Sequence, residues 1–287
     1  MKLVTKIVSL AGLAAVLSGV PLLAGEGKTF KEKVIVEEPL KWYGVALSTG
    51  WDSLYMFRGT NVISHGTYGN NSNYGSGIYW TDLALTWNIT KNDSFAVEGW
   101  MGFGTQSTSY KEFDLLATYT HTFGDLALSA GYCLYYVFPT GYNLYTNELT
   151  VKAAYTFHAG AATITPSLAY YYELGPDISG GTGGARQNSS YLLARIDGSI
   201  PVYKDIVSLA PWTAFGVNFE YNARVSDGNA DFYNGVNNLE IGLAVPVKIN
   251  NMISVSAYGA YSYAFYNLWG TTDPSTFWGG AKVTLSF

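Results

Sequence analysis

The sequence predicts an all-β fold, a transmembrane antiparallel up-and-down β-barrel of twelve strands. Three observations lead to this prediction. Segments of about a dozen residues alternate between apolar and polar side chains, which is the period of a strand and not of a helix. The connections between these segments alternate between long and short. Aromatic residues make up 16% of the 287-residue chain and charged residues only 13%, and Tyr and Trp are the residues that border a membrane span.

Two properties of the whole chain exclude other classes of protein. The mean hydropathy of +0.08 is too low for a bundle of membrane helices, and it is the value that half-apolar strands produce. A single cysteine, Cys133, excludes an internal disulfide framework and a four-cysteine metal site.

The N-terminal region is expected to lie outside the barrel. Residues 1–25 have the features of a secretory signal peptide, with Lys2 and Lys6 before an apolar stretch and Ala24-Gly25 as small residues for cleavage. An uncleaved helical anchor is the alternative. Residues 26–41 are charged and contain Pro39, so we expect a periplasmic lead-in, followed by the barrel at 42–287. Removal of residues 1–24 leaves 14 basic and 21 acidic residues, a balance that argues against a nucleic-acid partner.

The first predicted strand covers residues 42–59, with Tyr43, Val45 and Leu47 on one face and Gly44, Ala46 and Ser48 on the other. Eleven further segments are predicted as strands, and most of them show the same two-residue period. They cover residues 78–90, 94–105, 111–123, 126–138, 147–158, 162–174, 189–202, 206–222, 237–249, 252–268 and 276–287. The alternation is especially regular in 147–158, where Leu149, Val151, Ala153, Tyr155 and Phe157 oppose Glu148, Thr150, Lys152, Ala154 and Thr156.

The connections are the most specific signal. Six are long, at 60–77, 105–110, 139–146, 175–188, 223–236 and 269–275, and five are short, at 91–93, 124–125, 159–161, 203–205 and 250–251. The short ones contain Asn-Asp, Gly-Asp and Asn-Asn, which suit tight hairpin turns. Strict alternation of the two kinds gives twelve strands with both ends of the barrel domain on the short-turn side, as in membrane barrels with short periplasmic turns and long outer loops.

The last segment, S-T-F-W-G-G-A-K-V-T-L-S-F at 275–287, ends on its apolar face with Phe287. It resembles the closing strand of bacterial outer-membrane β-barrels, whose terminal aromatic residue is read by the barrel-assembly machinery. The resemblance implies that Phe287 is an assembly signal, that the protein lies in the outer membrane of a Gram-negative cell, and that its partners are this machinery, outer-membrane lipid and lipopolysaccharide.

A second resemblance covers one strand. Tyr55-Met56-Phe57-Arg58-Gly59 resembles the Y-x-F-R-G opening strand of a bacterial outer-membrane family of unknown function, the Gcw_chp group. Members of that group usually carry an Asp directly before the Tyr, whereas here Asp52 lies three residues earlier. The resemblance implies a barrel and no chemistry.

The charged residues of the predicted strands share the minority face, which we expect to point into the barrel. A soluble barrel or sandwich, the alternative, would place apolar side chains inside and more Lys and Glu outside. The predicted lumen-lining residues, ten acidic and five basic, are Asp52, Arg58, Asp82, Glu98, Glu112, Asp114, Glu148, Lys152, Glu173, Arg195, Asp197, Glu220, Glu240, Lys248 and Lys282. We expect Arg58 to pair with Asp52, Asp82 and Glu98 on neighbouring strands.

Nothing in the sequence favours catalysis. His65 falls in the first long connection, and His121 and His158 fall near short turns. No spacing of histidines suggests a metal site, the glycine-rich stretch 179–184 lacks the Lys of a phosphate-binding loop, and no cofactor is expected.

These patterns give three hypotheses for function. The first is a porin-like passive channel for small hydrophilic solutes, with a net acidic lumen that prefers cations by the logic of charged rings. The second is a non-conducting structural or adhesive barrel that binds ligands through aromatic outer loops. The third, an outer-membrane hydrolase, would depend on one of the histidines.

Overall fold

The structure, a computed structural model, describes residues 42–63, 77–105, 110–138, 144–175, 187–226, 229–266, 268 and 275–287. The predicted signal peptide (1–25) and lead-in (26–41) lie outside the described residues, as does His65. No helix among the described residues is long and apolar enough to cross a membrane.

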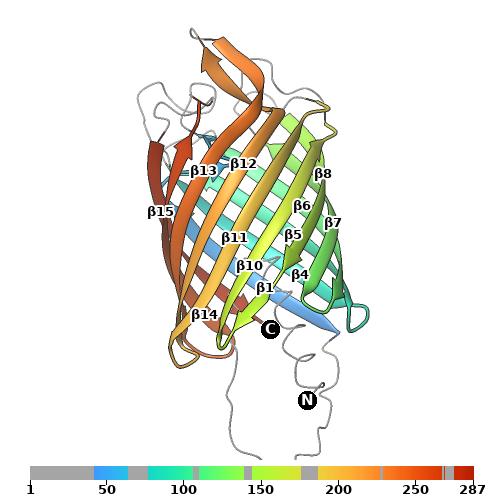
Figure 1. The fold of residues 1–287 in the computed structure, drawn as a ribbon, viewed down its shortest axis with the longest axis vertical. Coiled ribbons are helices and arrows are strands. Elements are labelled where there is room, and N and C mark those ends of the chain that lie inside the picture. The colour runs from blue at the N-terminus through green and yellow to red at the C-terminus, as the bar shows by residue number, and fades with distance from the viewer. Residues whose placement is uncertain are drawn as a thin grey trace, which may run out of the picture.

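Twelve antiparallel strands form one closed barrel (Figure 1), which confirms the predicted fold class. β1 pairs with the last strand, from Ala46 opposite Ser286 to Asp52 opposite Gly280, and this pairing closes the wall. β8 and β9 together make one wall strand, since both pair with β10. The strands of the wall are β1 (Tyr43–Asp52), β4 (Ile78–Asn88), β5 (Asp93–Gly104), β6 (Lys111–Phe123), β7 (Leu126–Val137), β8 (Leu144–Tyr155) with β9 (Phe157–Ala159), β10 (Ala162–Glu173), β11 (Ser190–Tyr203), β12 (Val207–Ser226), β13 (Asn229–Lys248), β14 (Ile253–Ala264) and β15 (Ser275–Ser286).

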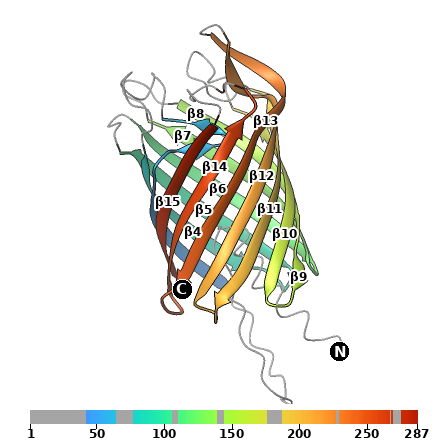
Figure 2. The ribbon, with the colours of Figure 1, turned by 60° about the vertical axis from the view of Figure 1, so that its left-hand side comes forward.

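The short connections lie at one end of the barrel, drawn at the bottom of Figures 1 and 2, and the long connections begin at the other end. β1 begins at the short-turn end, because Tyr43 lies opposite Trp87 next to the β4–β5 turn. β15 ends there too, because the amide of the following residue, Phe287, donates to the Val45 carbonyl. We call the other end the long-connection end. Apart from the two regions described next, the strands agree with the predicted ranges to within four residues.

The connection predicted at 223–236 is wrong over most of its length, because β12 and β13 continue through it as 20-residue strands. Val225 lies opposite Ala230, and the Arg224 guanidinium lies 3.1 Å from a carboxylate oxygen of Asp231. This hairpin projects beyond the rest of the barrel (Figure 2). Asn, Asp and Gly are poor strand formers, but here each strand supplies the other with backbone partners, which outweighs that preference.

The predicted first strand, 42–59, is also wrong in its second half. β1 ends at Asp52, and residues 53–63, which we call the strap, leave the wall and form a small hairpin of their own, β2 (Met56–Phe57) with β3 (Thr60–Asn61). Arg58 and Gly59 occupy its turn with φ of 50° and 81°. Positive φ at two successive residues is the geometry of a two-residue hairpin turn, and it ends the strand that alternation alone would continue.

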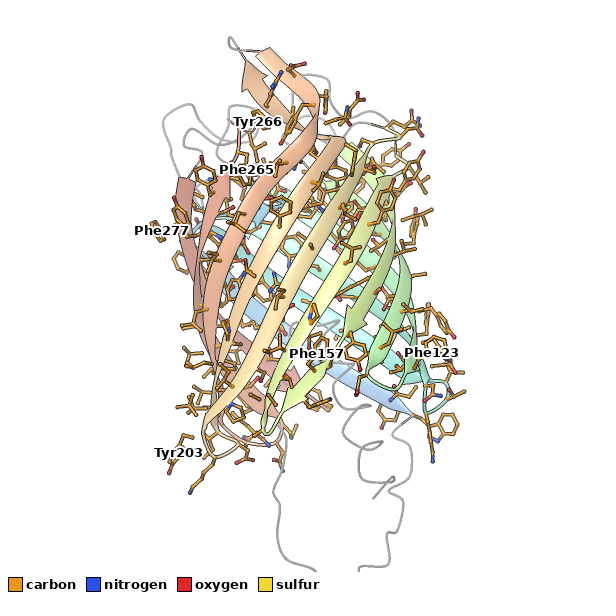
Figure 3. The ribbon with its side chains drawn as sticks, in the orientation of Figure 1. Phe123, Phe157, Tyr203, Phe265, Tyr266 and Phe277 are labelled. Carbon is orange, nitrogen blue, oxygen red and sulfur yellow. The ribbon has the colours of Figure 1, made fainter. Side chains whose placement is uncertain are left out.

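The outer face of the barrel is apolar and is bordered by aromatic residues at both ends. Phe123, Phe157 and Tyr203 lie toward the short-turn end, and Phe265, Tyr266 and Phe277 lie toward the long-connection end (Figure 3). Large apolar side chains such as Leu149, Val151, Leu168 and Ile241 are exposed between them. The buried face of the same strands carries the charged residues, so the partition is the reverse of that in a soluble protein.

A candidate channel interior and the strap that crosses it

The strap begins at the wall next to β1 and reaches the opposite side of the barrel. At its start, the Ser53 amide donates to Gly279 O (2.8 Å) and the Gly279 amide donates to Ser53 Oγ (3.0 Å), which ties it to β15. Tyr55 stacks on Trp100 of β5, with ring centroids 5.6 Å apart, and Phe57 meets the ring of Tyr135 on β7 edge-on. These contacts place successive strap residues against successive parts of the wall.

Arg58, at the tip of the strap, is held on the far wall by its side chain. Its Nη1 and Nη2 donate to the two carboxylate oxygens of Glu148 on β8, at 2.5 and 2.8 Å. The Arg58 side chain is 8% exposed and that of Glu148 is 1% exposed. A fork-to-fork pair of this kind combines two charge-assisted hydrogen bonds in fixed geometry, and such geometry is what makes burial of both charges tolerable.

Aromatic rings from three wall strands surround the same guanidinium. Its Cζ lies 3.9 Å from the ring centroid of Tyr171 on β10, 4.6 Å from that of Tyr221 on β12 and 5.5 Å from that of Tyr191 on β11. Tyr135 donates its hydroxyl to Glu148 at 3.3 Å. We call Glu148 and these three tyrosines, Tyr171, Tyr191 and Tyr221, the cage.

The backbone of the strap tip is fixed as well. The carbonyl oxygen of Arg58 accepts hydrogen bonds from the side-chain amides of Asn237 (2.8 Å) and Asn222 (3.0 Å). Asn222 lies in a bulge of β12, where the register shifts between Phe219 and Ala223. The bulge turns a residue of the wall toward the strap, which is a common use of bulges in barrels.

The strap changes the partners that the sequence predicts for Arg58. Pairing of Arg58 with Asp52, Asp82 and Glu98 is wrong, because the strap carries Arg58 away from β1 to Glu148. Asp52 instead accepts hydrogen bonds from Trp80 Nε1 (3.1 Å) and from the hydroxyl of Tyr258.

Four of the ten acidic candidates form a band along one side of the interior, over β4, β5 and β6. Asp82 lies beside Glu98, and Glu112 lies beside Asp114. Tyr110 donates to Glu112 at 2.6 Å. One carboxylate oxygen each of Asp82 and Asp114 is buried without a hydrogen-bond partner. This band is therefore rich in negative charge, and Lys282 is the cation that lies near Asp82 and Asp52.

The remaining candidates are distributed around the rest of the wall. Arg195 pairs with Asp197 two residues along β11, with Nη2 to Oδ1 at 2.7 Å, and Lys152 lies near both. Their side chains are 33% and 41% exposed, so solvent reaches this part of the inner face, unlike the cage. Elsewhere, Glu173 accepts a hydrogen bond from the Thr146 hydroxyl, and Glu240 accepts one from Trp212 Nε1 (2.8 Å). Lys248 Nζ lies 3.8 Å from a carboxylate oxygen of Asp205 at the short-turn end. Glu220 lies in the β12 bulge with φ of 58°.

The two described histidines lie at the short-turn end beside carboxylates. His121 Nδ1 lies 2.6 Å from Asp93 Oδ1, and His158 Nε2 lies 3.4 Å from Asp125 Oδ1. Among the residues that the structure describes, no group of three or more His, Cys, Asp or Glu side chains could hold a metal ion. Cys133 is buried and free.

Sequence reasoning missed the cage and its supporting amides. Tyr171 and Tyr191 share a strand face with Glu173 and Arg195, so their position on the charged face could have marked them as inward aromatic residues. Asn222 and Asn237 border a segment that composition assigns to a loop, and no sequence signal connects them to Arg58.

Comparison with known proteins supports the architecture. No protein-family model matches the chain, and no curated protein sequence matches it, so membership of the Gcw_chp group stays a prediction. Among solved structures, an outer membrane channel from Pseudomonas putida F1 is similar over 90% of this chain and 100% of its own, with 14% identity and a TM-score of 0.58.

Two other solved structures are more distant. The translocator domain of the autotransporter NalP from Neisseria meningitidis aligns with 96% of this chain and 94% of its own at 17% identity, with a TM-score of 0.49. The NanC porin aligns with 84% of this chain and 98% of its own at 9% identity, with a TM-score of 0.49. The likeness to the Pseudomonas putida channel alone supports the architecture, and at 14% identity that likeness concerns only the fold, a closed β-barrel.

Proposed function

We propose that the protein is an outer-membrane channel for small hydrophilic solutes, with a mild preference for cations. The observation that carries the proposal is the partition of charge in the wall. Acidic side chains gather on the inner face, and the outer face between the two aromatic borders is apolar. The interior of a membrane barrel is polar and in porins is a water-filled channel, and an excess of carboxylates in such a channel favours cations over anions. The likeness to an outer membrane channel agrees with this proposal.

The location and partners follow from the same proposal. An apolar band with aromatic borders suits contact with lipid hydrocarbon and head groups, here outer-membrane lipid and lipopolysaccharide. Export would use the predicted signal peptide, and insertion would use the barrel-assembly machinery with Phe287 as its signal.

The proposal is tested by single-channel recording of the refolded mature protein in planar bilayers, with reversal potentials measured in a KCl gradient. We expect discrete steps and a reversal potential on the potassium side. Glu98→Gln should move the reversal potential toward that of chloride, whereas Lys152→Gln, a matched change on the inner face, should move it toward that of potassium. A folded barrel that gives no steps, even after removal of the strap, would contradict the channel.

The strap gives a specific reason to retain a second candidate, a non-conducting barrel that binds ligands through its outer segments. It crosses the interior, where its side chains contact β5, β7, β8, β10, β11 and β12 and its backbone contacts β13. Among the aromatic residues of the long connections, Tyr68, Tyr74, Tyr142 and Trp269 lie outside the described residues. Tyr233 of β13 packs on Tyr266, with ring centroids 4.9 Å apart. This candidate expects no conductance, and ligand binding that is lost when the long connections are shortened.

A hydrolase is not proposed. His121 and His158 contact Asp93 and Asp125 at the rim of the barrel, and the absence of an enzymatic function stays a prediction.

A further inference from the structure

The cage belongs to the wall, whereas the arginine that fills it belongs to the strap. Glu148 on β8, Tyr171 on β10 and Tyr191 on β11 are fixed by the ladder of the barrel, and Tyr221 lies in the bulge of β12. The guanidinium is therefore an intramolecular ligand in a site whose carboxylate and two of whose three rings are positioned by strand pairing in the wall.

The geometry of the cage selects a guanidinium group. Glu148 offers two carboxylate oxygens to two parallel N–H groups, at 2.5 and 2.8 Å, which a planar fork satisfies and a tetrahedral ammonium does not. The ring of Tyr171 lies 3.9 Å from Cζ, within the range of a cation–π contact. Arginine and other solutes with a guanidinium or amidinium group match this arrangement.

We propose that the cage is a guanidinium-binding site, that its occupation by Arg58 keeps the strap across the barrel, and that a guanidinium-bearing solute that displaces Arg58 opens the channel. The opening step rests on the proposed channel function, whereas binding to the cage does not.

The burial of the pair sets the order of events. With Arg58 8% exposed and Glu148 1% exposed, a solute reaches the cage only in the minority of molecules whose strap has moved, so it acts by shifting that population. The Arg58 guanidinium is tethered to the barrel, so it competes with a free solute for the cage at an effective concentration on the millimolar scale or above. The wild-type protein should therefore respond only to high concentrations of free guanidinium compounds, and a chain without the Arg58 side chain should bind them directly.

The test uses methylguanidinium as the probe and the mature barrel refolded in detergent or in planar bilayers. Arg58→Ala empties the cage, Arg58→Ala with Glu148→Gln removes its carboxylate, and Arg195→Ala is the matched control because Arg195 pairs with Asp197 on β11. Methylammonium serves as the control for charge without the planar fork.

We expect methylguanidinium to raise the temperature of heat modification of the Arg58→Ala protein, with an apparent affinity at least about tenfold higher than for the double variant, since hydrogen bonds to a charged group contribute more than a factor of ten. Methylammonium should bind Arg58→Ala at least about tenfold more weakly. Equal affinity of methylguanidinium for the single and double variants would overturn the cage.

In bilayers, Arg58→Ala should conduct with larger or more frequent steps than the wild type and the Arg195→Ala control. Methylguanidinium at high concentration should make the steps of the wild-type protein more frequent, whereas methylammonium at the same concentration should not. Arg58→Lys, which keeps the charge but not the fork, should fall between wild type and Arg58→Ala. Should Arg58→Ala fail to fold, Glu148→Gln releases the same strap from the other side.

Identical steps in wild type, Arg58→Ala and Glu148→Gln would overturn closure by the strap. A third outcome separates the two proposals. If no variant gives steps, but methylguanidinium raises the temperature of heat modification of Arg58→Ala and not of the double variant that lacks the Glu148 carboxylate, the proposed channel is overturned and the cage is supported.

Discussion

At the scale of single residues, the decisive pair is Arg58 with Glu148. Two charges with almost no exposure to solvent lose most of their hydration. That loss is offset only when the geometry of the pair is good and other groups supply the remaining hydrogen bonds and contacts. Here a bidentate contact, three tyrosine rings and the Tyr135 hydroxyl do so. Removal of either partner leaves the other charge buried alone. We expect this to weaken the docking of the strap on the wall by about 3–5 kcal/mol.

The two ways of breaking this pair should affect ion selectivity in opposite directions. Arg58→Ala leaves an uncompensated carboxylate at Glu148, so the reversal potential in a KCl gradient should move toward that of potassium. Glu148→Gln leaves an uncompensated guanidinium and should move it toward that of chloride. Both should increase the conductance, because both release the strap. Shifts of equal sign in the two variants would show that these side chains lie outside the conducting path.

Gly59 should be as necessary to the strap as Arg58. It has φ of 81°, and a Cβ at this position would lie 2.6 Å from Cγ of Asn238. Gly59→Ala therefore adds overlap with the wall to the roughly 1–2 kcal/mol that a left-handed conformation costs an L-residue. Gly124→Ala is the matched control, because Gly124 has φ of 64° at a short turn with no atom within 4 Å of the added Cβ.

Limited proteolysis of the folded barrel measures the difference. Gly59→Ala should expose the strap to cleavage between residues 53 and 63, whereas Gly124→Ala should leave it protected. Equal protection in both variants would mean that the strap tolerates the displacement of its turn.

At the scale of elements, the β12–β13 hairpin combines two roles that can be separated. Its outer part contains the Arg224–Asp231 pair, and its base contains Asn222 and Asn237, which hold the Arg58 carbonyl. Replacement of residues 224–231 by Asn-Gly should leave a closed barrel, because β11, β12, β13 and β14 stay paired below the hairpin.

Heat modification on electrophoresis and proteolysis of the strap check this prediction. The shortened protein should keep its heat-modifiable mobility and a protected strap, whereas Asn222→Ala with Asn237→Ala should keep the mobility but lose the protection. Loss of the folded mobility on shortening would show that the projecting part helps to close the barrel.

The two regions that the sequence failed to predict are both cases in which partners across the barrel decide local structure. Residues 53–59 were predicted as the end of the first strand because 54–57 are apolar, and the local hint of a turn is Gly59 directly after Arg58. Residues 229–236 contain two Asn, two Gly or Asp turn formers and no regular alternation, yet they pair with β12 as far as Ser226 opposite Asn229. By contrast, 111–123 was predicted to the residue, because its alternation, its short turn and its neighbours all favour the same strand.

At the scale of the whole molecule, the alternation of long and short connections was sufficient to predict twelve strands. It also predicted that the first strand begins, and the last strand ends, at the short-turn end of the barrel. The period of two also placed Asp82, Glu112, Asp114 and Glu148 on the minority faces of their strands, and these side chains are buried. It could not predict how far the first long connection folds inward, because that path depends on Glu148, Tyr171 and Asn237, which are between about 90 and 180 positions away along the chain. The position of the candidate channel was thus predictable, and the element that crosses it was not.

The apolar outer face gives a prediction that separates a membrane barrel from a soluble one. Val151 is 55% exposed at the middle of the β8–β9 wall strand, and Ile249 is 59% exposed beside the short turn at Asn250. In a membrane, Val151→Arg should lower the free energy of unfolding by about 2–4 kcal/mol and Ile249→Arg by about 0–1 kcal/mol, because the cost of a charge depends on depth. Reversible denaturant titrations in lipid vesicles measure both values. Because the two side chains are exposed to a similar degree, a barrel in water would tolerate the two arginines equally, and equal values in vesicles would contradict the membrane-spanning orientation.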